Sequence, residues 1–255
     1  MPDYTIPNLK NACRILDCLG QCKDAMSNAE LANQLDIPRS TVLRILCTLE
    51  AQRFVRRIGK RYLLGMALIP LGTAAGGQHS LLEECQPLLA SITQDSEETS
   101  HLVTLVNDKA LILQVCASPH PMSAHSRKGT LADLHCSASG KVLLAYLPEA
   151  EREACLARIP LHARTPHTLT RARDLKKELQ EVRHQGYAID EQEYHLGVRC
   201  MATPVFSTDG SVCHAIGITA SIYRFTEDRI PTMLNLLQNA SRELSIAASL
   251  GLSTE

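Results

Sequence analysis

One short segment of the chain concentrates side chains that could do chemistry. It holds a histidine, a cysteine, two serines and a lysine, at His135, Cys136, Ser137, Ser139 and Lys141. A phosphate-binding loop would need glycine at position 135 and Ser or Thr at position 142, where valine stands. A nucleophile elbow would need a GxSxG pattern, which the sequence lacks. The segment therefore favours binding over catalysis, and we expect no enzyme activity.

The two serines of this segment also suit the start of a helix. A hydroxyl at such a position accepts a hydrogen bond from a free backbone N–H group. The same N–H groups attract anions, because the N-terminus of a helix carries partial positive charge. We therefore predict that one face of the segment, near Ser139, binds a carboxylate.

The ten cysteines give a weak metal or redox signal. They include no CxxC pair, the local spacing on which zinc ribbons and redox dithiols depend. Cys13, Cys18 and Cys22 cluster, but a helix places the first two about 140° apart, so a metal site is not favoured there. We expect most thiols to be small core residues and predict no cofactor. One alternative stays open, a metal- or thiol-sensing site built from His135, Cys136, Asp190 and Cys200.

The composition is that of a globular protein whose N-terminal and C-terminal parts differ in net charge. The 255 residues are 45% hydrophobic and 21% charged, and this length favours two domains. Residues 1–80 carry ten Lys and Arg against six Asp and Glu, while the remainder is acidic. The first residues resemble no secretory signal, and Pro and Gly interrupt the longest uncharged stretch, residues 62–82. We expect a cytoplasmic protein without a membrane span, whose basic end binds nucleic acid.

The elements of the basic end predict a winged helix-turn-helix over residues 1–65. Ser27 and Glu30 form a capping box, the signature of a helix start. Pro38 separates that helix from the next, and Gly59 supplies the turn of a hairpin. The expected elements are helices at residues 8–19, 27–35 and 39–51 and strands at residues 54–57 and 61–64.

The third helix and the hairpin carry groups that suit DNA. An amphipathic helix fits the major groove, where Arg44 can reach base edges, and a basic ribbon can contact phosphates. Solvated arginines or a protein-docking winged helix are the alternatives, but the joint pattern favours double-stranded DNA. The predicted DNA contacts are Arg39, Ser40, Thr41, Arg44, Thr48, Arg56, Arg57, Lys60 and Arg61.

A linker, residues 66–80, and a second domain, residues 81–255, follow the hairpin. The linker is uncharged and rich in small residues, and Pro70 and the pair Gly76-Gly77 predict a kink or break in its helix. Strands then alternate with helices, which is typical of a mixed sheet covered by helices, the α/β (α+β) class. The expected helices are residues 81–94, 139–146, 149–158, 170–185 and one capped by Thr226; the expected strands are residues 100–106, 109–117, 121–127, 187–190, 198–206 and 212–219.

Several segments resemble the IclR family of transcriptional regulators. Leu31–Gly65 resembles the family's DNA-binding domain, and Leu134–Ala145, Gly186–Glu193 and Gly197–Phe206 resemble its effector-binding domain, in the family's order. The resemblance implies a connecting helix and a GAF-like or profilin-like second domain. The effector contacts that it implies are Met122, Ala132, Ala138, Ser139, Asp190, Val198, Cys200, Gly217 and Thr219. Two positions depart from the family: Gly217 where hydroxyls are usual, and Asp133 where proline is usual.

These observations predict a ligand-responsive transcriptional regulator. We expect a homodimer, with a homotetramer as the alternative assembly, that binds palindromic operator DNA. Its effector is expected to be a small organic molecule, a carboxylate or sugar acid. Two alternatives stay open: an enzyme with an attached DNA-binding domain, and a metal- or thiol-responsive regulator.

Overall fold

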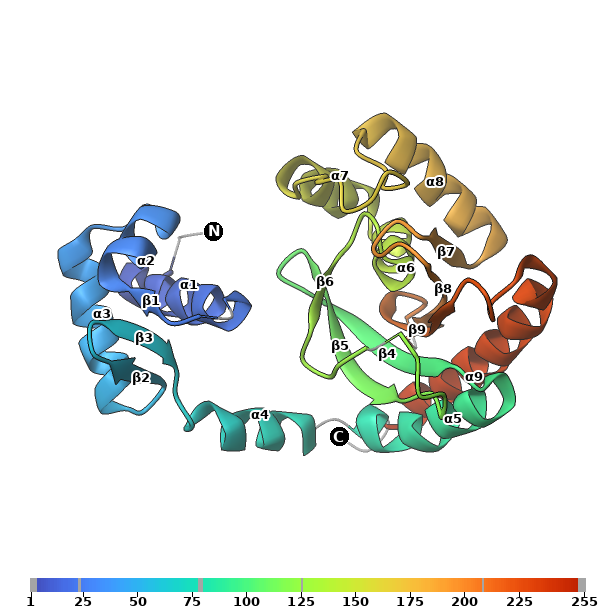
Figure 1. Cartoon of the computed structure of the whole chain (residues 1–255), viewed down its shortest axis with the longest axis horizontal. Coiled ribbons are helices and arrows are strands. Elements are labelled where there is room, and N and C mark those ends of the chain that lie inside the picture. Colours follow the sequence, from blue (N-terminus) through green and yellow to red (C-terminus); the bar gives the residue numbers. More distant parts are fainter. Residues whose placement is uncertain (1–3, 23, 78–79, 125, 208, 252–255) are drawn as a thin grey trace. The chain divides into compact units, whose positions relative to one another are not determined.

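The computed structural model describes residues 4–22, 24–77, 80–124, 126–207 and 209–251. The chain divides between residues 78 and 79 into two units (Figure 1). The first unit has one hydrophobic core and the second has two. This division lies inside the linker predicted at residues 66–80. No helix in these ranges is long and apolar enough to cross a membrane.

The N-terminal unit is a winged helix-turn-helix. The predicted capping box is present, since Ser27 Oγ accepts from Glu30 N at 3.2 Å and Glu30 Oε2 accepts from Ser27 N at 2.7 Å. Gly59 turns the hairpin with φ 60°. The strands pair antiparallel in the order β1-β3-β2, and the helices bury their apolar faces in one core. The elements are α1 (Pro7–Gln21), β1 (Met26–Ser27), α2 (Asn28–Leu35), α3 (Arg39–Ala51), β2 (Val55–Ile58) and β3 (Arg61–Leu64).

The expectation of a break at Pro70 is wrong, whereas the described linker helix has its last residue at Gly77, in the Gly76-Gly77 pair where a break was also expected. Helix α4 runs without interruption from Leu68 to Gly77. Pro70 lies in its first turn, where a backbone N–H has no helical acceptor to lose, so proline is tolerated there. Residues 78–79 lie outside the described residues.

The C-terminal unit is built on one six-stranded sheet in which every pairing is antiparallel, so the expectation of a mixed sheet is wrong in strand direction, while the covering by helices is as expected. Its strand order is β6-β5-β4-β9-β8-β7, so segments far apart in sequence become neighbours. The elements are α5 (Ser80–Ser96), β4 (Thr99–Val106), β5 (Lys109–Cys116), β6 (Leu131–Asp133), α6 (Ala138–Tyr146), α7 (Glu149–Arg158), α8 (Ala172–Gln185), β7 (Ala188–Glu191), β8 (Val198–Phe206), β9 (Val212–Ser221), the 3₁₀ turn η1 (Glu227–Arg229) and α9 (Ile230–Gly251).

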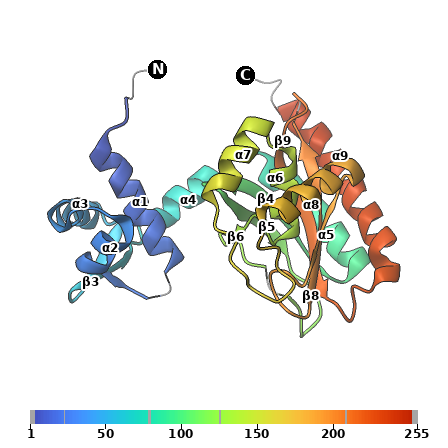
Figure 2. The same cartoon turned by 90° about the horizontal axis from the view of Figure 1, so that it is seen from above.

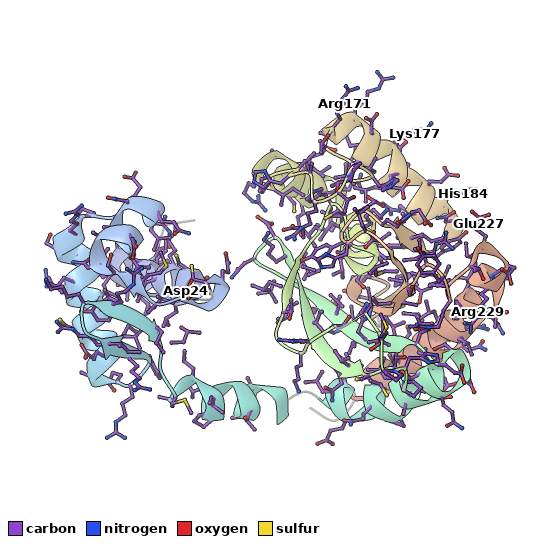
Figure 3. All side chains as sticks on the ribbon, in the orientation of Figure 1. Asp24, Arg171, Lys177, His184, Glu227 and Arg229 are labelled. Atoms are coloured by element: carbon purple, nitrogen blue, oxygen red, sulfur yellow. The ribbon has the colours of Figure 1, made fainter. Side chains whose placement is uncertain are left out.

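Helices cover both faces of this sheet (Figure 2). Helices α6, α7 and α8 pack on one face around Val103 and Ala202, while α5 and α9 pack on the other around Leu102 and Met201. Successive strand residues thus enter opposite cores, as the alternation of strand side chains requires. Helix α8 is amphipathic: its apolar stripe is buried, and Lys177 projects outward (Figure 3).

Two local predictions for this unit are wrong. The strand expected at residues 121–127 does not form at the described positions, 121–124 and 126–127, which are irregular and exposed or half-buried; the edge strand is β6, which follows Gly129 at φ 82°. Pro121 offers no N–H to a ladder, which disfavours strand pairing at that point. Thr226 precedes the final helix as expected, but its side chain makes no capping hydrogen bond and the 3₁₀ turn η1 comes first.

Candidate functional site

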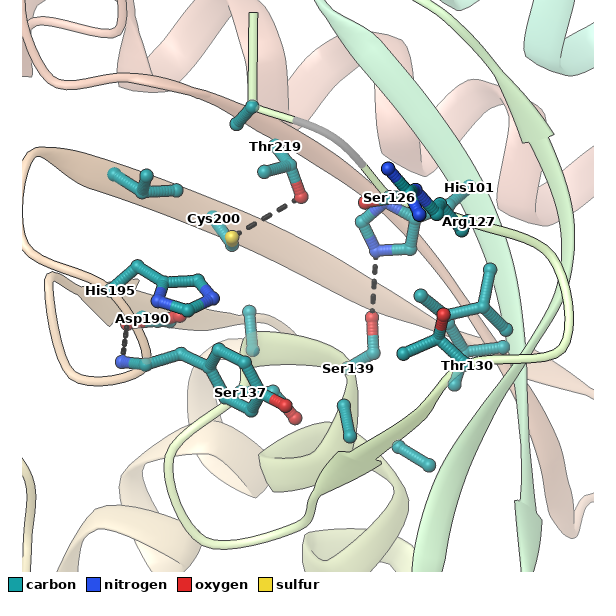
Figure 4. A pocket seen from close by; sticks show the side chains of 18 residues that line it. His101, Ser126, Arg127, Thr130, Ser137, Ser139, Asp190, His195, Cys200 and Thr219 are labelled. Carbon is teal, nitrogen blue, oxygen red and sulfur yellow. Dashed lines mark hydrogen bonds between the residues drawn. The ribbon is translucent and has the colours of Figure 1, made fainter. Parts of the chain in front are cut away.

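A cavity of about 330 Å³ opens in the C-terminal unit between the start of α6, the sheet, and the loops that follow β5 and β7 (Figure 4). Its walls combine apolar side chains such as Val103 and Ile112 with a concentrated set of polar ones. The polar lining residues include His101, Ser126, Arg127, Thr130, Ser137, Ser139, Asp190, Tyr194, His195, Cys200 and Thr219. The cavity therefore offers both apolar contact and several hydrogen-bonding groups to one ligand.

Seven of the nine residues predicted as effector contacts line this one cavity: Ala132, Ala138, Ser139, Asp190, Val198, Cys200 and Thr219. The other two do not. Met122 is 85% exposed on the loop after β5, where its carbonyl oxygen accepts from Arg224 Nη1. Gly217 lies in β9 directly opposite His101 of β4, so the histidine side chain and not the glycine reaches the cavity.

The first turn of α6 forms one wall. Ser137 is the N-cap: its Oγ accepts from Gly140 N at 3.2 Å and donates to the carbonyl of Asp133. Ser139, which we also expected to serve this helix start, bonds instead through Oγ to His101 Nε2 at 3.1 Å. The first backbone N–H groups of a helix have no acceptor within it, so those of Ala138 and Ser139 suit an anion.

His101 occupies space that only a glycine opposite can provide. A Cβ at Gly217 would lie 2.7 Å from His101 Nε2 and 2.8 Å from the carbonyl oxygen of Met201. Burial lowers the pKa of His101 to about 4, so its imidazole is neutral at pH 7. Its Nδ1 atom is buried and has no hydrogen-bond partner among the described residues. The glycine that departs from the family pattern thus makes room for a neutral imidazole at the cavity wall.

Asp190 is the carboxylate of the cavity and is only 1% exposed. Its Oδ1 accepts from the backbone N–H groups of Glu193 at 2.7 Å and Tyr194 at 3.2 Å. Its Oδ2 is buried without a hydrogen-bond partner among the described residues. Desolvation, helped by the charge of Glu193, raises the pKa of Asp190 to about 7. Near neutral pH this group can therefore either accept or donate a hydrogen bond.

Cys200 and Thr219 sit beside each other on β8 and β9, with Sγ and Oγ1 3.2 Å apart. Burial, followed by the neighbouring Asp190, raises the pKa of the Cys200 thiol well above its usual value. A protonated thiol is neither a strong nucleophile nor a metal ligand. Cys200 therefore contributes a small, weakly polar wall.

Lys141 does not face the cavity. Its side chain is 1% exposed, and Nζ donates to Glu193 Oε1 at 2.6 Å and to Glu178 Oε1 at 3.0 Å. These bonds join α6 to α8 and to the loop that carries the Asp190 contacts. Lys141 is a positioning group, in agreement with the absence of a phosphate-loop pattern around it.

The predicted DNA-contacting side chains lie on the surface of the N-terminal unit. On α3, Arg39, Ser40, Arg44 and Thr48 are exposed and Thr41 is half-buried. Arg56 and Lys60 are exposed on the hairpin, and Arg57 bonds through Nε to the carbonyl of Gly59 at the turn. The polar face of the helix and the hairpin thus have the exposure that groove and phosphate contacts require.

Arg61 differs from the other described DNA-contact candidates because its side chain forms an ion pair within the unit. Its Nη2 donates to both carboxylate oxygens of Glu30 at 2.9 Å, and its Nε donates to the carbonyl of Ala25 at 2.6 Å. It ties β3 to the start of α2. Its contact with phosphate stays a prediction.

Comparison with known proteins identifies the family. Residues 9–59 match the IclR helix-turn-helix domain, and residues 73–246 match the C-terminal domain of bacterial transcriptional regulators of the IclR type, more than half of the chain. The chain belongs to the IclR family. It is 30% identical over 246 residues to the transcriptional repressor IclR of Escherichia coli (strain K12), which covers 95% of this chain and 90% of the repressor.

Solved structures of IclR proteins have the same fold as this chain. The crystal structure of Thermotoga maritima IclR matches with a TM-score of 0.68 at 30% identity and covers 94% of this chain and 98% of that one. An IclR homologue from Microbacterium hydrocarbonoxydans, complexed with 4-hydroxybenzoate, matches with a TM-score of 0.72 at 22% identity over 94% and 98% of the two chains. This IclR-family chain is a DNA-binding transcriptional regulator whose second domain has the effector-binding fold.

The metal-sensing alternative built from four residues of this IclR-family domain is wrong. Within the part of the chain that the structure describes, no three His, Cys, Asp or Glu side chains converge on a possible ion. His135 instead directs Nε2 to the carbonyl of His162 at 3.0 Å. Cys136 is fully buried, and burial raises its pKa to about 12, so it is a core thiol.

Sequence reasoning missed several cavity residues, among them His101, Arg127, Tyr194 and His195. A lone histidine in a strand and residues of irregular loops give no local signal of a shared site. The one available hint was Gly217, because glycine inside a strand often marks the close approach of another group.

Proposed function

We propose that the cavity of this regulator binds a small organic carboxylate that carries a hydroxyl or carbonyl group away from its anionic end. The observation that carries the proposal is the buried Oδ2 of Asp190, which has no hydrogen-bond partner among the described residues although Oδ1 has two. A buried polar atom without a partner costs about 1–3 kcal/mol, which a ligand's polar group would recover.

The anionic end of the ligand is expected at the first turn of α6. The backbone N–H groups of Ala138 and Ser139 point from a helix N-terminus, and Arg127 brings a guanidinium to the same cavity. Val103 and Ile112 supply apolar walls, which favours a carboxylate with an apolar middle over a fully hydroxylated sugar acid. The 4-hydroxybenzoate bound by the Microbacterium homologue combines a carboxylate with a distant hydroxyl.

The test is titration of the protein–operator complex with hydroxy acids, including 4-hydroxybenzoate and a sugar acid, and with their neutral amides. The operator comes from sequencing the DNA that the protein retains in cell extract. Asp190→Asn and Thr219→Val should each weaken the response to the active acid by about 1–3 kcal/mol and leave operator affinity without ligand unchanged. Asp95→Asn, on the exposed face of α5, is the matched control. Wild-type responses in both cavity variants would place the effector elsewhere.

We also propose that the regulator acts in the cytoplasm as a homodimer, or a tetramer of two dimers, on palindromic DNA. Two copies of α3 on one side of B-DNA require half-sites about 10 base pairs apart or a multiple of that spacing. Footprinting should show two such half-sites protected together. Protection of one asymmetric half-site by a monomer would contradict the proposal.

A further inference from the structure

Three sulfur atoms meet at the end of α1 in the N-terminal unit. Met26 Sδ lies 3.3 Å from Cys22 Sγ and 3.7 Å from Cys18 Sγ. The two cysteines are one helical turn apart, so their thiols face each other as well. Cys18 and Met26 are buried, and Cys22 is half-buried.

The spacing of these sulfurs is close to that of a three-coordinate metal site. Metal–sulfur bonds of about 2.3 Å place the sulfurs of a trigonal site about 4 Å apart. The distances from Met26 Sδ to Cys18 Sγ and to Cys22 Sγ are about 0.3 Å and about 0.7 Å shorter than this, so an ion would enter with an outward movement of the side chains that is larger at Cys22. Thiolate and thioether together select a soft cation, and Cu(I) suits them best, because thioethers are poor ligands for Zn²⁺ and Mg²⁺.

We propose that Cys18, Cys22 and Met26 form a three-sulfur site for Cu(I) in the DNA-binding unit. On binding, each thiol releases its proton to solvent, so that two thiolates and one neutral thioether hold one monovalent cation without any change of oxidation state. Methionine is not a zinc-type ligand, which is why the spacing of cysteines alone did not indicate this site.

The site has an entry route and a structural connection to the helix-turn-helix. A surface depression of about 650 Å³ reaches Cys22 and Met26 and is bordered by Asp24, Glu30 and other polar residues. Met26 pairs with Tyr62 in the small sheet, and the next residue, Ser27, caps α2. A bound ion would therefore join the end of α1 to the strand that leads into the helix-turn-helix.

This arrangement gives the regulator a second input that does not involve the cavity of the other unit. An ion that binds the folded unit and not the unfolded chain stabilises the folded form by mass action. Because Cys18 lies in α1, Cys22 directly follows α1 and Met26 lies in β1, that stabilisation acts on the packing of the end of α1 against β1 and on the start of α2.

The test uses the full chain, reduced and without oxygen, with Cu(I) supplied from a coloured Cu(I) chelator of known affinity. The wild type should take up one equivalent of Cu(I) per chain more from the chelator than Cys18→Ser or Cys22→Ser. Loss of groups outside the coordination shell costs about 10–100-fold in metal affinity, so loss of a direct thiolate ligand should cost at least about 100-fold. Met26→Leu, which preserves volume and folding, should lower the affinity about tenfold or more.

Two exposed cysteines of the same unit, Cys13 and Cys47, provide matched controls. Cys13→Ser and Cys47→Ser should bind as many equivalents of Cu(I) per chain as the wild type. In the wild type and in these two controls, but not in Cys18→Ser or Cys22→Ser, Cu(I) should also slow backbone hydrogen exchange over residues 15–35. Equal Cu(I) binding by wild type and Met26→Leu, loss of the equivalent in Cys13→Ser, or unchanged hydrogen exchange in that segment would each overturn the proposal.

Discussion

The substitution Gly217→Ala tests whether the cavity wall depends on the pairing of His101 with a glycine. The added Cβ would lie 2.7 Å from His101 Nε2, 3.0 Å from its Cε1 and 2.8 Å from the carbonyl oxygen of Met201. Overpacking of this kind costs about 1–3 kcal/mol. The displaced ring would also lose its hydrogen bond to Ser139, worth about 0.5–1.5 kcal/mol. We therefore expect the free energy of unfolding to fall by roughly 2–4 kcal/mol.

Urea unfolding followed by circular dichroism measures this loss, and a double-mutant cycle assigns it. His101→Ala removes two of the three close contacts of the new methyl group, so it should cost less in the Gly217→Ala background than in the wild type, by at least about 0.5 kcal/mol. Gly72→Ala is the control, because a Cβ there meets nothing within 4 Å. Wild-type stability of Gly217→Ala, or additive effects of the two substitutions, would refute the reasoning.

Four further substitutions test the buried charges and the DNA-binding face. Because the folded pKa of Asp190 is raised to about 7 from 3.8, the folded state binds more protons between these values. Stability should therefore fall as pH rises, by at most roughly 1.4 kcal/mol per pH unit. Urea unfolding of Asp190→Asn should lack this fall of stability with pH. The depressed pKa of His101 makes stability rise with pH in the wild type and in Asp190→Asn alike, so the comparison of the two proteins isolates Asp190. Arg44→Ala should cost about 1–3 kcal/mol of operator affinity and relax discrimination at one base pair per half-site; equal weakening of binding to random DNA would argue against base reading. Lys60→Ala should instead reduce the slope of log K against log salt concentration by about 1. Lys141→Ala leaves buried carboxylate charge uncompensated, so thermal unfolding should show a loss of about 3–5 kcal/mol.

The most accurate predictions from the sequence are for helices whose first and last residues are set by neighbouring residues in the chain. Helices α3 and α7 begin directly after Pro38 and Pro148, and their predicted bounds are those observed. The capping box at Ser27 and the left-handed Gly186 after α8 likewise depend only on neighbours in the chain. Such signals act over one turn of helix, so they remain readable without tertiary structure.

Features that depend on pairing between distant segments could not be predicted. The contact of His101 with Gly217 follows from the register of β4 against β9, more than a hundred residues apart. The role of Arg61 as the partner of Glu30 likewise requires β3 to lie beside the start of α2. A strand was predicted at residues 121–127, but the strand that pairs with the outer side of β5 is β6, a few residues further along the chain.

The charge states of the polar groups in the cavity support the proposal that its ligand is anionic. His101 is neutral, Cys200 is protonated, and Asp190 carries only part of a negative charge near pH 7, while Arg127 lies in the wall. Lys141 lies outside the cavity, yet it ties α6 to the loop whose backbone holds Asp190. A ligand that binds both the start of α6 and Asp190 therefore contacts two elements that the protein already couples. It can shift the regulator between two states only by its difference in affinity for them, and this pair of contacts is where such a difference can arise.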